Sequence, residues 1–200
     1  MHNSINKTSN KKKVVKNRKK KKKKKNRLWI LKIVLWTIIL SGSISFFANM
    51  ILPKVNLIIA FIILIAIILL GIISDIVGVA VTAASETPFH AMAAKKIDGA
   101  KIAVKLIRNA DKVSNFSSDV IGDVCGVVSG AIGALILSKI TTNLANPSDK
   151  YILFIGAVIG AIIAAITVGG KAVGKTFAIK NCNDIIFAVS KVIHVIKKER

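Results

Sequence analysis

The chain has 200 residues, of which 53% are hydrophobic, yet it carries a formal net charge of +22. Its charges and apolar residues separate into basic connectors and long apolar runs, which is typical of membrane proteins and not of soluble domains. The two cysteines and three histidines are scattered, and no nucleophile–base pair or phosphate-binding loop occurs. A disulfide framework, a zinc site and an enzyme activity therefore have no support.

The N-terminal segment, residues 1–27, contains 14 lysines and arginines and no acid. Such a block cannot bury apolar surface, so we predict a disordered cytoplasmic tail that orients the protein and contacts anionic lipid. A low-complexity run without a selected role is one alternative. Nucleic acid is another, but no aromatic residue interleaves the lysines and no binding fold follows, so we predict no nucleic-acid partner.

Four apolar segments follow, and each is long enough to cross about 30 Å of hydrocarbon as a helix. The second is about ten residues longer than a crossing needs, so it must tilt or bend, and Gly71 and Gly78 are the predicted bend points. We predict an all-α membrane protein with four transmembrane helices, at residues 28–52, 56–85, 118–140 and 151–170.

The connectors differ in charge. The segment 86–116 and the tail 171–200 are rich in lysine and arginine, whereas the links near residue 53 and at 141–150 carry few basic residues. By the positive-inside rule, the N-terminus, the 86–116 connector and the C-terminus are all cytoplasmic. We therefore predict a multi-pass protein of the cell (plasma) membrane with both termini inside.

Residues 87–116 form a predicted belt of short helices on the membrane surface. Thr87 and Pro88 suit the start of one helix that runs to about Lys96, and a second, amphipathic helix follows Asp98-Gly99. The tail 171–200 repeats the amphipathic pattern. The basic face of the second belt helix is predicted to contact anionic headgroups through Lys101, Lys105, Arg108 and Lys112.

Glycines recur at four-residue spacing in the last two apolar segments. Such spacing allows helices to approach closely, either within one subunit or between two subunits. We expect a homodimer. The predicted packing positions are Gly122, Gly126, Gly130, Gly156 and Gly160.

Acidic residues lie in or beside the apolar segments. An ionised carboxylate near the bilayer centre costs roughly 2.5–3.5 kcal/mol, so each needs a reason. Carboxylates and hydroxyls together suit a hard cation such as Mg²⁺. The predicted cation site consists of Ser85, Glu86, Asp123, Asp119 and Asp75. The alternative, strongest for Glu86 and Asp119, is that the acids are hydrated at the interface and paired with lysines.

Three sequence words, "ASETPFHAM", "GAKIAVKLIRNADKVSNF" and "VIGDVCGVVSGAIGALI", occur in this order. They resemble the transmembrane domain of the cyclin-M (CNNM) and bacterial CorB/CorC family, which has three spans, a Ser-Glu-Thr motif at the end of the first and a belt of helices. The resemblance covers residues 56–200, with a family-like membrane domain at 56–170, and leaves the tail 1–27 and the span 28–52 as additions.

The resemblance implies Mg²⁺ efflux, exchanged for Na⁺, by a dimer with an acidic cytoplasmic cavity. Ser85 and Glu86 would line that cavity, Asp123 stands where the family has Asn, and Ala83 replaces a frequent serine. The sequence ends at residue 200, where the family continues into nucleotide-sensing CBS domains, so we expect no ATP regulation in cis and consider a separate regulatory chain.

From these observations we predict a divalent-cation (Mg²⁺) transporter without CBS domains and without a firmly bound cofactor. The alternative is a non-transporting membrane scaffold or partner subunit that binds anionic lipid or another membrane protein.

Overall fold

The computed structural model describes residues 31, 33–46, 50, 55–142 and 148–198. The predicted tail 1–27 lies outside these residues, as do both ends of the predicted span 28–52. The chain divides into two compact units, Met1–Ile39 and Leu40–Arg200. Within the described part of the first apolar segment, the helix Ile33–Phe46 is apolar but shorter than a membrane crossing requires. A membrane crossing at residues 28–52, which would bring the number of transmembrane helices to four, therefore stays a prediction.

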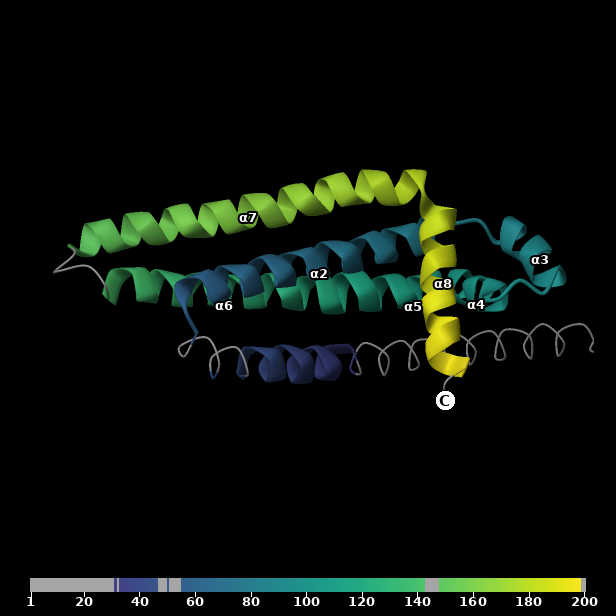
Figure 1. Cartoon of the computed structure of the whole chain (residues 1–200), viewed down its shortest axis with the longest axis horizontal. Coiled ribbons are helices and arrows are strands. Elements are labelled where there is room, and N and C mark those ends of the chain that lie inside the picture. Colours follow the sequence, from purple (N-terminus) through teal and green to yellow (C-terminus); the bar gives the residue numbers. More distant parts are fainter. Residues whose placement is uncertain (1–30, 32, 47–49, 51–54, 143–147, 199–200) are drawn as a thin grey trace, which may run out of the picture. The chain divides into compact units, whose positions relative to one another are not determined.

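Among the described residues, three helices are long and apolar enough to cross a membrane, and they run side by side (Figure 1). This confirms an all-helical fold in the described residues and indicates a membrane protein. The first is α2, Leu57–Ala83. The second is a continuous helical run, Ala110–Thr142, and the third is α7, Asp149–Lys180. The continuous run consists of α5 (Ala110–Ser114), the π-helix η2 (Asn115–Gly122) and α6 (Asp123–Thr142).

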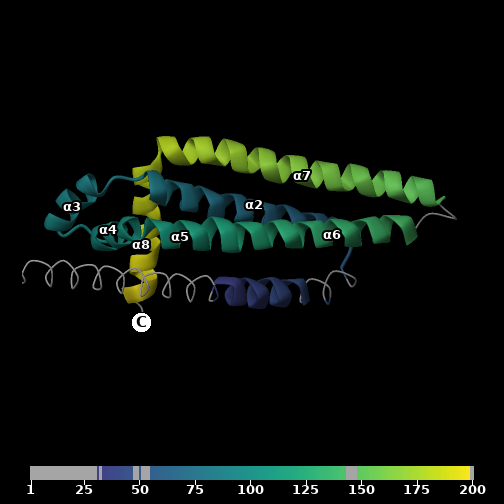
Figure 2. The ribbon, with the colours of Figure 1, turned by 180° about the vertical axis from the view of Figure 1, so that it is seen from behind.

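Three shorter helices gather at one end of the long ones, where α8 lies across them (Figures 1 and 2). They are α3 (Glu86–Ala94), α4 (Ala100–Arg108) and α8 (Cys182–Lys198). We call α3, α4 and α8 the belt. The cap of α3 is Ser85 and not Thr87 as predicted, because the Ser85 hydroxyl accepts a hydrogen bond from the Thr87 N–H.

Two predicted boundaries were wrong. The belt segment ends near Asn109, where the backbone leaves the helical conformation, and the second long helix begins at Ala110 instead of 118. The third long helix continues to Lys180, well past residue 170. No proline follows the apolar run. The pair Gly169-Gly170 weakens a helix but does not end this one, because at Gly170 α7 lies close against Ile72 of α2.

Two apolar clusters hold the described ranges 55–142 and 148–198 together. The first joins α2 to α6, and its members recur every four residues on each helix, so each helix presents one stripe to the other. The second joins the C-terminal end of α2 to α7 and the belt. The buried members of the first are Ala60, Leu64, Ile68, Val124, Val128, Ile132 and Ile136; those of the second are Ala80, Val81, Phe89, Ala103, Val104, Ala178 and Ile186.

Candidate functional site

Asp75 is a buried acid in the apolar helix α2. The residue is only 5% exposed, and its Oδ2 lies 3.6 Å from Nζ of Lys175 on α7. That distance is longer than a hydrogen bond, and Oδ2 is buried without a hydrogen-bond partner among the described residues. The Lys175 side chain is 53% exposed. An acid so placed is costly unless it is paired or functional.

A second acid–lysine pair lies next along α7. Asp123, the first residue of α6, has Oδ1 3.5 Å from Nζ of Lys171. The same ammonium group donates to the carbonyl of Gly122 at 3.4 Å. Because Lys171 and Lys175 are four residues apart on one helix, they lie on the same face. Helix α7 thus supplies one cation to the acid of α2 and one to the acid of α6.

Buried serines join α2 to the π-helix beside these pairs. The Ser74 hydroxyl donates to the Ser117 carbonyl at 2.7 Å, and the Ser117 hydroxyl donates to the Ser74 carbonyl at 2.6 Å. The Ser118 hydroxyl is buried without a partner in the described part of the chain. We call this group the polar junction: Ser74, Asp75, Ser117, Ser118, Asp123, Lys171 and Lys175.

Glycine is required at two points of this contact. A Cβ on Gly78 would overlap the Ser118 hydroxyl, and a Cβ on Gly71 would stand 2.9 Å from Cβ of Cys125. Both glycines therefore let α2 approach the second long helix closely. The helix α2 runs from Leu57 to Ala83 without interruption, and the bends that the sequence predicts at these glycines stay a prediction.

Sequence reasoning missed the π-helix and both lysines. A π-helix often marks a functional site, and η2 delivers Ser117 and Ser118 to the junction. No residue pattern in the sequence predicts the π-helix. The lysines did leave a signal, since two basic residues one turn apart close an apolar run and would share a helix face.

Ser85 and Glu86 make their contacts in the belt. The Ser85 N–H donates to Oδ1 of Asn183 at 3.1 Å. Oε2 of Glu86 is 3.1 Å from Nε of Arg108 and 3.1 Å from Nε2 of His90. The hydrogen bond from Arg108 lowers the pKa of Glu86 below its usual value, and the hydrogen bond from His90 lowers it further by a smaller amount.

The predicted cation-site residues thus divide between two places. Asp75 and Asp123 belong to the polar junction, whereas Glu86 pairs within the belt. Asp119 is exposed and forms no ion pair in the described ranges. No group of three or more His, Cys, Asp or Glu side chains among the described residues could hold a metal ion. One site uniting Glu86 and Asp123 stays a prediction.

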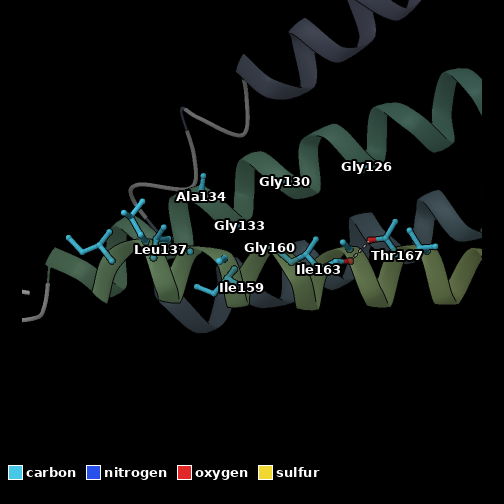
Figure 3. Close-up of a pocket in the computed structure, with 15 residues that line it drawn as sticks. Gly126, Gly130, Gly133, Ala134, Leu137, Ile159, Gly160, Ile163 and Thr167 are labelled. Atoms are coloured by element: carbon cyan, nitrogen blue, oxygen red, sulfur yellow. Dashed lines mark hydrogen bonds between the residues drawn. The ribbon is translucent and has the colours of Figure 1, made fainter. Parts of the chain in front are cut away.

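A groove of about 620 Å³ runs between α6 and α7 (Figure 3). Gly126, Gly130 and Gly160 line it, and a Cβ on any of them would meet no atom within 4 Å. Gly122 and Gly156 differ, since each lies close to atoms of a neighbouring helix. Two of the five predicted packing glycines therefore serve contacts within the chain, and packing by the other three stays a prediction.

Comparisons with known proteins give no relative. No protein-family model matches the chain, and no curated protein and no solved structure matches it either. The resemblance to the CNNM/CorC family accordingly rests on the sequence words alone.

Proposed function

We propose that this chain is a multi-pass transporter of the plasma membrane that moves a divalent cation, Mg²⁺, through the polar junction, in the manner of the CNNM/CorC type. The observation that carries the proposal is Asp75. It is 5% exposed within an apolar helix, and one of its oxygens lacks a hydrogen bond. Intramembrane acids are costly and are by default functional.

Charge balance suggests how the ion would enter. Asp75 and Asp123 carry two negative charges, and Lys175 and Lys171 carry two positive ones, so the resting junction is neutral. One Mg²⁺ that displaced both ammonium groups would leave it neutral again. Lys175 is half exposed and has water to move into.

Oxygen ligands stand beside the two acids. The hydroxyls of Ser74, Ser117 and Ser118 and the carbonyl of Gly122 replace part of the ion's hydration shell. In this proposal the chain has four spans with cytoplasmic termini and acts as a homodimer together with a separate regulatory chain.

The experiment is Mg²⁺ release from loaded proteoliposomes, followed with a fluorescent indicator. Asp75→Asn should slow release about tenfold or more, because an amide binds Mg²⁺ far more weakly than a carboxylate. Asp149→Asn is the matched control, since it changes an exposed acid at the other end of α7, and its release should equal that of the wild type. Transport is refuted if wild-type vesicles release Mg²⁺ no faster than protein-free vesicles, or if Asp75→Asn releases it at the wild-type rate.

A second candidate function is favoured by the pairing itself. Asp75, Asp123 and Glu86 each have a cationic partner, so no acid among these three is left for a free ion. A non-transporting scaffold that binds anionic lipid would keep these pairs permanently. It predicts wild-type vesicles without Mg²⁺ release, and loss of binding to anionic vesicles when residues 1–27 are deleted.

A further inference from the structure

A second cavity, of about 350 Å³, lies between the turn that joins α3 to α4 and the helix α8. Its charged lining consists of Lys96, Lys101, His194 and Asp98. Ile97 and Ile102 provide apolar surface in the same cavity. None of these residues belongs to the polar junction, so this is a separate site.

The cavity carries an excess of positive charge. Its one acid, Asp98, has Oδ1 3.5 Å from Nε2 of His194. In the described ranges, neither Lys96 nor Lys101 forms an ion pair, and both are exposed. Two lysines against one acid leave a net charge of +1 when the histidine is neutral and +2 when it is protonated. Such a site suits an anion, and phosphate is the anion that lysines commonly bind.

The backbone of the turn that carries Lys96 is held against α8. Lys96 has φ 57 and Gly99 has φ 85, so the turn between α3 and α4 is tightly folded. A Cβ on Gly99 would stand 3.1 Å from both the Lys191 amide nitrogen and the Ser190 hydroxyl, which shows that the turn rests directly on α8. Helix α4 has no acid in its first turn, so its positive end adds to the potential of the cavity.

We propose that this cavity binds the phosphate group of an anionic membrane lipid. The apolar side formed by Ile97 and Ile102 suits the glycerol and upper acyl carbons and would give nothing to a free phosphate ion. The residues that line the cavity come from the belt helices and the turn between α3 and α4. The belt gathers at one end of the long helices (Figure 1), where we expect an interface with headgroups. The proposal goes beyond cation transport and does not depend on it, because lipid binding is measured without Mg²⁺.

The experiment titrates the purified full-length chain, in neutral detergent, with phosphatidic acid, phosphatidylcholine or sodium phosphate, and counts bound ligand by native mass spectrometry. One phosphatidic acid should bind about tenfold more tightly than phosphatidylcholine. Lys96→Gly and Lys101→Gln should each weaken that binding about tenfold. Lys96→Gly is a safe substitution for folding, because glycine adopts the positive φ of this position without strain.

Lys95→Gln is the matched control. Lys95 is the neighbour of Lys96 in the chain, so the substitution removes an equal charge, but the Lys95 side chain does not line the cavity. It should change the affinity less than about twofold. An equal loss from Lys95→Gln would overturn the proposal in favour of a diffuse basic surface, as would equal binding of the two lipids. Sodium phosphate that binds as tightly as phosphatidic acid, with the same loss in Lys96→Gly, would overturn the lipid as ligand.

Discussion

Replacing Lys175 by methionine should destabilise the protein more than replacing its partner, Asp75, by asparagine. The two differ sharply in burial, because the side chain of Asp75, taken without its backbone, is 7% exposed and that of Lys175 is 53% exposed. Lys175→Met leaves a buried carboxylate without a counter-charge. Asp75→Asn leaves an ammonium group that is already half in water.

The expected magnitudes follow from this asymmetry. An unpaired carboxylate within an apolar helix costs about 2.5–3.5 kcal/mol on the mild insertion scale. The half-hydrated lysine, left alone, costs less than about 1 kcal/mol, since exposed ion pairs contribute little. For a chain of this size each kcal/mol shifts Tm by roughly 2–4 °C, so Lys175→Met should lower Tm by roughly 5–14 °C and Asp75→Asn by less than about 4 °C.

The assay is thermal unfolding in one detergent, with the double variant Asp75→Asn/Lys175→Met completing a mutant cycle. The double variant should recover most of the loss of Lys175→Met, because the uncompensated charge is gone. If Asp75→Asn proves as destabilising as Lys175→Met, or the double variant loses the sum of both, the assignment of Asp75 as a buried, lysine-compensated charge is refuted.

Two further predictions concern close packing and pH. Gly78→Ala should lower the stability by about 1–3 kcal/mol, because the new methyl group overlaps the Ser118 hydroxyl. Gly130→Ala, which faces open space, should leave unfolding in detergent unchanged or slightly raise the stability, and equal losses would contradict the packing described. Glu86 has a lowered pKa, so its contribution to stability is complete above its usual value of 4.5 and is lost as pH falls through the lower folded value. A folded-state titration of its carboxyl carbon by NMR should therefore have a midpoint below 4.5, and Arg108→Gln should move it upward; a midpoint above 4.5 would refute the pairing.

The sequence determined the coarse architecture, because apolar length and amphipathic period are local properties of the chain. They predicted the three long apolar helices, for example α2 within one residue or two of the expected 56–85, and the short helices on either side of Gly99. The ends were predicted less well. Helix α7 outruns its apolar stretch because helix formation does not stop where hydrophobicity does.

The pairing of the acids was decided only by the tertiary structure. From the sequence, Ser85, Glu86 and Asp123 were predicted to share one cation site, since each is a polar residue at the end of a span that faces the 86–116 connector. The fold instead turns α3 away at the Ser85 cap, so that Glu86 meets Arg108, while α7 brings Lys171 to Asp123 and Lys175 to Asp75. The helix register and the π-helix η2 determine which acid lies opposite which lysine. Both are set by close packing at residues such as Gly78 and Ser118, and no local sequence pattern specifies them.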